Sequence, residues 1–377
     1  MEYSHEDVEY SRKILIDENT IADSVDITSF VEEIEVIPII EKDPYFVGDI
    51  YKIFLHKDKF IIFDRVISSQ VLLFNKQGEF EKRIISKGFG PLESLQINDC
   101  WLNNDGSLDA YDFALKKVYH FDSSYSLEST LKGEKNIYHS LARIPGTDNF
   151  LGYSLFNSYN DHNYQLAKLD NNLEATSAYL RYNVNMKGAN ILSFRNHFHP
   201  YEDTIRFMRS YDNTIYNLVG GELKNGILLE YKNNSLDRKS FCKLILNNKQ
   251  LFVADDFDLN ERNKIFQPYS YYNGNWVENK NNIILTSINE SKPFTTIFDK
   301  NTNKVVLNSR VILEKEKYKM AIPPLTSTGD GYFIGVINSL YLKYYLLEDS
   351  TLQKFADPSY NSFLIIKLKL KNTYEAS

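Results

Sequence analysis

The chain is poor in cysteine, tryptophan and methionine, and it lacks any long apolar run. Its two cysteines, Cys100 and Cys242, cannot build a disulfide framework, and neither lies in a Cys-x-x-Cys motif of the kind that holds zinc. Both are interpreted as small buried hydrophobic residues. No segment approaches 18 consecutive apolar residues, so no transmembrane helix is predicted.

A basic surface for nucleic acid is also missing. The chain has 43 Lys and Arg against 50 Asp and Glu, which gives a net charge of -7, and its lysines are scattered. Binding to DNA or RNA is therefore not expected. The segment from Met1 to Glu9 is acidic and polar and does not resemble a signal peptide. Two alternatives stay open: a cytoplasmic protein, or an exported protein whose signal has been removed.

What the chain has in abundance is tyrosine, phenylalanine and asparagine. It contains 27 Tyr and 24 Phe, and 43% of its residues are hydrophobic, which is ample for a core. Aromatic residues fit pleated, half-buried surfaces, so this composition favours sheet over helix. Asparagine pairs such as Asn171-Asn172 and Asn281-Asn282 suit hairpin turns, because asparagine tolerates left-handed backbone geometry.

A pattern of strands repeats with a spacing of about 48 residues. An apolar strand is followed by a short polar gap, a second apolar strand ending in Phe or Leu, and then Asp or Asn. A strand-built period of this length indicates radially stacked four-stranded sheets, that is, a β-propeller. The clearest copies are Phe60–Asp64 with Val71–Asn75, Leu108–Asp112 with Val118–Asp122, and Phe150–Tyr153 with Leu166–Asp170.

The repeats predict an all-β, six-bladed β-propeller over residues 31–371, between a flexible segment at 1–30 and a tail at 372–377. Between blades 4 and 5 we expect an insertion at about 232–263 with one helix, capped by Ser235 and with Asp237 in its first turn. A second insertion is expected at about 340–360, in blade 6.

The two ends of the propeller are expected to pair. The strand Phe363–Leu370 has no hairpin partner after it, and the strand Glu35–Ile39 has none before it. Because an unpaired strand edge is a liability, we predict that the N-terminal strand becomes the outermost strand of blade 6.

A family resemblance follows from these residues. The opening strand before Gly48–Ile53, the strand Phe60–Asp64, the turn Lys87–Glu93, the segment Asp212–Tyr216 and the closing Asn361–Ile366 resemble the six-bladed β-propeller proteins of Bacteroidetes. Those proteins are often exported lipoproteins, are loosely related to NHL-repeat propellers and are largely uncharacterised. The resemblance covers residues 31–371 and implies a periplasmic or outer-surface lipoprotein whose signal and lipid anchor have been removed. It supplies no catalytic residue.

Candidate metal ligands are few, and no cofactor or metal is predicted. His197 and His199 alternate along a strand and would face the same way, but zinc needs a third protein ligand, and none follows at diagnostic spacing. Asp256-x-Asp258-x-Asn260 imitates a calcium loop, but its sixth residue is Glu261 instead of glycine. Catalytic residues therefore stay unknown.

Two further sets of side chains are candidate ligand-binding residues. Arg206 and Arg209 differ by an odd number, so on a strand they point to opposite faces, and one of them could meet an anionic ligand or an inter-blade carboxylate. The stretch Tyr269, Tyr271, Tyr272 and Trp276 is the most concentrated aromatic segment. It is expected either to form a binding surface or to pack between blades.

These observations favour a non-catalytic recognition protein whose loops bind a glycan, a peptide or a protein at the cell envelope. The alternative is a metal-dependent hydrolase or lyase with its site at the central channel, and a purely structural role in an envelope complex is a third possibility. A propeller hosts binding and catalysis alike, so the fold does not decide between them.

Overall fold

The computed structural model describes residues 2–3, 9–26, 29–40, 45–90, 92–157, 160, 162–189, 191, 196–253, 259–310, 312–314, 318–320, 324–328, 331–338 and 362–371. These residues form a six-bladed β-propeller with few helices, as the sequence predicts. The chain divides into two compact units. Unit 1 comprises Met1–Ile14, Ile84–Gly274 and Asn289–Ser291, and unit 2 comprises Leu15–Arg83, Asn275–Ile288 and Lys292–Ser377.

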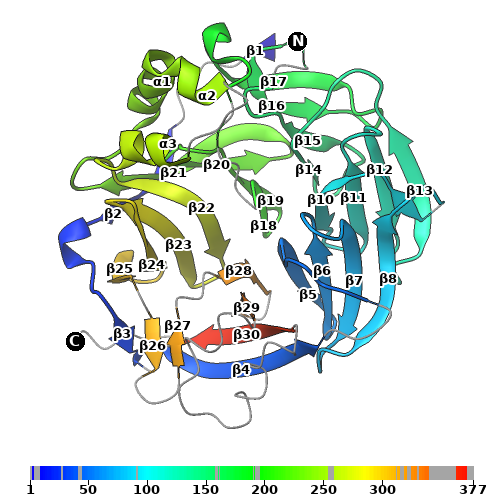
Figure 1. Cartoon of the computed structure of the whole chain (residues 1–377), viewed down its shortest axis with the longest axis horizontal. Coiled ribbons are helices and arrows are strands. Elements are labelled where there is room, and N and C mark those ends of the chain that lie inside the picture. The colour runs from blue at the N-terminus through cyan, green and yellow to red at the C-terminus, as the bar shows by residue number, and fades with distance from the viewer. Residues whose placement is uncertain are drawn as a thin grey trace. The chain divides into compact units, whose positions relative to one another are not determined.

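Unit 1 holds three sheets that follow one another along the chain (Figure 1). Blade 2 is β10 (Ile97–Leu102), β11 (Leu108–Asp112), β12 (Lys117–Phe121) and β13 (Leu127–Lys132). Blade 3 is β14 (Ser140–Arg143), β15 (Phe150–Tyr153), β16 (Tyr164–Leu169) and β17 (Ala175–Arg181), with β1 (Glu2–Tyr3) parallel to β17. Blade 4 is β18 (Phe198–Tyr201), β19 (Thr204–Met208), β20 (Thr214–Val219), β21 (Glu222–Tyr231) and β2 (Tyr10–Ile16).

Unit 2 holds blade 6 and most of blades 1 and 5. Blade 1 is β5 (Lys52–His56), β6 (Lys59–Asp64), β7 (Gln70–Asn75) and β8 (Phe80–Lys87), followed by β9 (Glu93–Ser94). Blade 5 is β22 (Tyr271–Glu278), β23 (Asn282–Asn289), β24 (Lys292–Asp299) and β25 (Lys304–Ser309). Blade 6 is β28 (Pro324–Ser327), β29 (Tyr332–Asn338), β30 (Ser362–Leu370) and β4 (Val31–Ile40). A small sheet joins β27 (Tyr318–Met320), β26 (Ile312–Glu314) and β3 (Val25–Asp26).

The Asp or Asn that ends the repeated pattern shapes the outer hairpin of blades 1, 2 and 3. In blade 3, one carboxylate oxygen of Asp170 accepts hydrogen bonds from the backbone N–H groups of Asn172 and Glu174, at 2.8 and 2.9 Å. Asn75 and Asp122 accept the same pair of bonds in blades 1 and 2. These bonds stabilise a tight turn, so the repeated acid is explained by local backbone geometry.

The aspartates at the end of the second strand of blades 1 and 2 also accept hydrogen bonds from backbone N–H groups. The carboxylate of Asp64 accepts from the N–H groups of Gly48 and Ile67 within unit 2, at 2.8 and 3.1 Å. The carboxylate of Asp112 accepts from Leu95 and Leu115 within unit 1, both at 2.8 Å. Both acids are fully buried, and their hydrogen bonds replace the water that burial removes.

The predicted pairing of the two chain ends is confirmed. Strand β4 runs antiparallel to β30 as the outermost strand of blade 6, with Ile39 opposite Phe363 and Ile37 opposite Ile365. All four side chains are buried in one apolar cluster of unit 2. An N-terminal strand therefore covers the edge that the last hairpin leaves open.

The helical insertion between blades 4 and 5 is also confirmed, but its details differ from the prediction. It contains α1 (Arg238–Asn247), α2 (Lys249–Val253) and α3 (Leu259–Phe266), where the sequence suggested one helix. The N-cap is Asp237 and not Ser235, because the carboxylate of Asp237 accepts from the N–H of Ser240 at 2.6 Å.

The remaining expectations concern the N-terminal residues, the second insertion, the C-terminal tail and the calcium-like segment. Residues 1–30 were expected to be flexible, but β2 adds a fifth strand to blade 4, and the Ser11 hydroxyl donates to the carbonyl of Gly226 at 3.0 Å. The predicted insertion at 340–360, the tail at 372–377 and most of the calcium-like segment, including Asp256 and Asp258, lie outside the described residues.

Candidate functional site

A polar cluster lies inside unit 1 where blades 3 and 4 meet the start of α1. We call it the arginine cluster and define it by Gln165, Arg209, Ser210, Asp212 and Arg238. All but Arg238 are buried, and Arg238 is half-buried. Gln165 comes from β16, Arg209 to Asp212 come from the turn after β19, and Arg238 opens α1.

The cluster is built around one carboxylate and one amide. Asp212 accepts from Nε of Arg209, from the hydroxyl of Tyr216 at 2.9 Å and from the N–H of Thr214 at 3.0 Å. The Oε1 atom of Gln165 accepts from Nη2 of Arg238 at 2.8 Å. These bonds fix the side chains in one arrangement, which is what a preorganised site requires.

The electrostatics of the cluster follow from burial and from its two cations. Burial raises the pKa of Asp212, but the positive charges of Arg209 and Arg238 outweigh burial and hold the pKa below its ordinary value. Burial and the charge of Arg209 both lower the pKa of Arg238. An arginine nevertheless stays protonated in proteins, so the cluster brings two positive charges and one negative charge together.

The Nε2 atom of Gln165 has no hydrogen-bond partner among the described residues, whereas the hydroxyl of Ser210 interacts with the hydroxyl of Tyr153. The amide nitrogen is a donor only, and the hydroxyl can also donate. A buried donor without a partner costs on the order of 1–3 kcal/mol, so such groups are uncommon unless something else satisfies them. Arg238 is also a donor in this cluster: one of its N–H groups bonds to Gln165 and another to the carbonyl of Ser210.

Of the two arginines singled out in the sequence, only Arg209 belongs to this cluster. Arg206 lies half-buried on β19, next to His199 of β18, with its guanidinium 4.9 Å from the ring centre of Tyr201. Arg209 follows the end of the strand and pairs with Asp212 three residues later. The structure therefore separates the two residues.

The two candidate histidines are buried. The Nδ1 atom of His197 lies 2.7 Å from the carbonyl of Met208, which fixes the proton on that nitrogen because a carbonyl can only accept. The ring of His197 packs on Tyr153, at 4.3 Å between ring centres, and against His139, at 5.6 Å. In the part of the chain that the structure describes, no three His, Cys, Asp or Glu side chains are grouped so that they could hold a metal ion.

The aromatic stretch divides into buried and half-buried residues. Tyr272 and Trp276 are buried, whereas Tyr269 and Tyr271 are half-buried. Tyr271 packs on Tyr211, with ring centres 5.5 Å apart, in the aromatic cluster that fastens the insertion. In this conformation, any contact with a ligand is left to Tyr269 and Tyr271.

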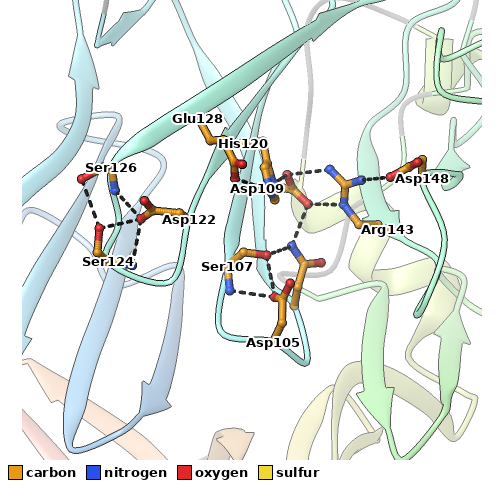
Figure 2. A network of polar contacts seen from close by, with 11 residues as sticks. Asp105, Ser107, Asp109, His120, Asp122, Ser124, Ser126, Glu128, Arg143 and Asp148 are labelled. Carbon is orange, nitrogen blue, oxygen red and sulfur yellow. Dashed lines mark hydrogen bonds and ion pairs between the residues drawn. The ribbon is translucent and has the colours of Figure 1, made fainter.

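A second polar network joins blades 2 and 3, and no sequence signal pointed to it (Figure 2). We call it the Asp109 network. Asp109 is fully buried and accepts two hydrogen bonds from Arg143, at 2.8 and 3.0 Å, one from Nδ1 of His120 at 2.7 Å and one from Asn103 at 2.9 Å. Asp109 and His120 face each other across β11 and β12, but Arg143 comes from β14 of the next blade.

The hydrogen bonds of this network shift the pKa values of Asp109 and His120. Burial raises the pKa of Asp109, but the bonds from His120 and Arg143 outweigh burial, so the pKa is below its ordinary value. The hydrogen bond to Asp109 raises the pKa of His120, and burial opposes this shift only in part. The network is therefore a charged link between neighbouring blades, with cations on both sides of one buried carboxylate.

The raised pKa of His120 gives the first prediction. The folded protein holds this proton more tightly than the unfolded chain, so the stabilisation is complete below about pH 6.5 and is lost as the pH rises through the folded-state pKa. His120 is partly exposed, so solvent screening limits the effect to about 0.5 kcal/mol. His120→Gln should therefore cost more stability at about pH 5.5 than at pH 8.5 in urea unfolding. An equal cost at both pH values would contradict it.

Comparisons with known proteins support the fold and the family. The profile of a family described as "Domain of unknown function (DUF4934)" matches residues 13–366. No curated protein matches the chain. Among solved structures, a "Putative exported protein" from Bacteroides fragilis is similar with a TM-score of 0.71 and 16% identity, over 95% of this chain and 99% of that one. A member of the DUF4221 family from Bacteroides vulgatus is similar with a TM-score of 0.51 and 9% identity, over 91% and 98%.

Proposed function

We propose that this chain, which belongs to the family described as "Domain of unknown function (DUF4934)", is a non-catalytic recognition protein that presents a binding surface to a glycan, peptide or protein partner at the cell envelope. The proposal rests on the insertion of unit 1. Its helices are fastened to the sheet by an aromatic cluster, in which Tyr211 stacks on Phe241 and Phe266 with ring centres 4.9 and 4.7 Å apart.

A fixed insertion is suited to binding, because a partner then loses little free energy in ordering it. Loops held by a rigid scaffold are also where binding residues gather in other folds. In Figure 1 the helices α1 to α3 lie together beside the end of β21. The insertion thus adds a defined surface to blade 4.

The charge of this surface differs from that of the whole chain. Helices α1 and α2 carry Arg238, Lys239, Lys243 and Lys249 and no acidic residue, whereas the chain has a net charge of -7. Lys239, Lys243 and Lys249 are exposed. A local basic surface favours a partner with anionic groups, both by attraction and by faster encounter.

The proposed location is the periplasm or the outer surface, as a lipoprotein. The support is the name of the similar Bacteroides fragilis protein, which is described as exported, together with the family resemblance of the repeats. Within the described residues, no helix is long and apolar enough to cross a membrane.

The proposal is tested by screening the protein against arrays of acidic and neutral glycans and peptides. We expect the native chain to bind acidic members, and the double variant Lys239→Glu, Lys243→Glu to bind them about tenfold more weakly. The control is Lys132→Glu, Lys135→Glu, which changes two exposed lysines of blade 2 by the same charge.

The rival function is a metal-dependent hydrolase or lyase. Stoichiometric zinc or calcium that survives a chelator wash, together with turnover of an array ligand, would replace the recognition proposal. If the two double variants bound the array ligands equally, the insertion would not be the binding surface.

A further inference from the structure

We infer that the arginine cluster is a binding site for a carboxylate group, such as that of an acidic sugar or of a peptide C-terminus. This inference deepens the proposed function and rests on it, since it names the chemical group that the basic insertion recognises. The residues that carry it are Arg238, Gln165 and Ser210, supported by Asp212 and Arg209.

The first argument is the balance of donors and acceptors. Gln165 is fully buried, its Oε1 atom already accepts from Arg238, and its Nε2 atom has no acceptor among the described residues. The Ser210 hydroxyl is also buried, lies beside the hydroxyl of Tyr153 and can donate. A carboxylate oxygen would accept from the amide nitrogen of Gln165, which the described residues leave unsatisfied.

The second argument is charge. Arg238 forms no ion pair with a carboxylate among the described residues, and its two hydrogen bonds go to neutral oxygens of Gln165 and Ser210. Of the charged groups that act on it, Arg209 repels it, and Asp212 is already engaged by Arg209. Two guanidinium groups and one carboxylate leave a net positive charge in a largely buried site, and a second anion would offset it.

The third argument is geometry. The planar guanidinium presents N–H groups in a fork that matches a planar carboxylate, and the side chain of Arg238 is held in place from both sides. Its guanidinium lies 4.9 Å from the ring centre of Phe241 and 5.5 Å from that of Phe156. Because Arg238 is half-buried and opens α1, the carboxylate would enter from the side of the insertion.

The test measures binding of four probes by calorimetry: sodium D-glucuronate, acetyl-alanyl-alanine, inorganic phosphate and neutral D-glucose. The expected result is saturable binding of glucuronate, of the dipeptide or of both, and none of glucose. Whichever of the two binds identifies the source of the carboxylate. Absence of binding for both, or tighter binding of phosphate than of either, would overturn the carboxylate assignment.

Two variants tie the binding to this cluster. Arg238→Gln should weaken the carboxylate probe by about tenfold or more, because a charge-assisted fork is lost. The matched control Arg181→Gln, at an exposed arginine of blade 3, should leave the affinity unchanged. Gln165→Glu places a carboxylate of the chain itself between the donors, so it should raise the melting temperature and weaken the probe by a similar factor.

The Gln165→Glu result separates a binding site from a structural network. If the cluster were only structural, a buried carboxylate would not compete with an added probe, and the affinity would stay unchanged. Array ligands that bind native protein and Arg238→Gln equally would overturn the carboxylate site and leave the recognition function standing. Probe binding accompanied by metal-dependent turnover would leave the carboxylate site standing and overturn the non-catalytic recognition function.

Discussion

Replacing Ile39 with aspartate is expected to lower the free energy of unfolding by about 4 kcal/mol, the largest effect of any change considered. Ile39 is fully buried on β4, opposite Phe363 of β30, in the apolar cluster that also contains Ile334. The change removes apolar contacts and introduces a carboxylate that the described surroundings cannot pair. Chemical unfolding followed by circular dichroism measures the loss.

The matched control is Glu35→Ala on the same strand. Glu35 is exposed, and its carboxylate lies 3.8 Å from the ammonium group of Lys367, so the expected cost is below about 0.5 kcal/mol. Equal stability of Ile39→Asp and Glu35→Ala would mean that β4 is dispensable for blade 6. The pairing of the chain ends would then not be required for folding.

Replacing Phe241 with alanine should release the insertion from blade 4. Phe241 is fully buried, stacks on Tyr211 and also faces Phe266, with ring centres 6.1 Å apart. Removing a buried phenylalanine costs about 3 kcal/mol, and here the loss falls on one locally packed segment. Limited proteolysis with mass spectrometry should show new cleavage sites within residues 232–267, while the sheets stay resistant.

Lys243→Ala provides the control, because this lysine is exposed on the same helix and its removal leaves the aromatic cluster intact. Its cleavage pattern should match that of the native chain. If Phe241→Ala instead accelerated cleavage throughout the chain, the insertion would be part of the cooperative core. The proposal that the insertion is a separately packed binding surface on blade 4 would then fail.

The two polar clusters of unit 1 illustrate different uses of a buried charge. In the Asp109 network the carboxylate of Asp109 accepts from His120 and Arg143. These two cations also lie 3.6 and 3.7 Å from the carboxylates of Glu128 and Asp148, so each cation has a second anionic partner. In the arginine cluster the donors exceed the acceptors. The first arrangement is sufficient as a link between blades, whereas the second is completed by an anion.

The sequence by itself determined the fold, because its signals are local. Strand alternation and the Asp or Asn at the hairpins of blades 1 to 3 act over a few residues, as the bonds of Asp170 to Asn172 and Glu174 show. The pairing of β4 with β30 was also predictable, since two strands without neighbours had one way to avoid open edges.

The site was decided only by the tertiary structure. Gln165 and Arg238 are 73 residues apart, and Asp109 and Arg143 are 34 apart, without a shared motif. Their contacts depend on how one blade packs against the next and on where α1 begins, which no local pattern encodes. For the same reason the sequence placed Arg206 and Arg209 on opposite faces of one strand, whereas β19 ends at Met208 and Arg209 lies in the turn that follows, paired with Asp212.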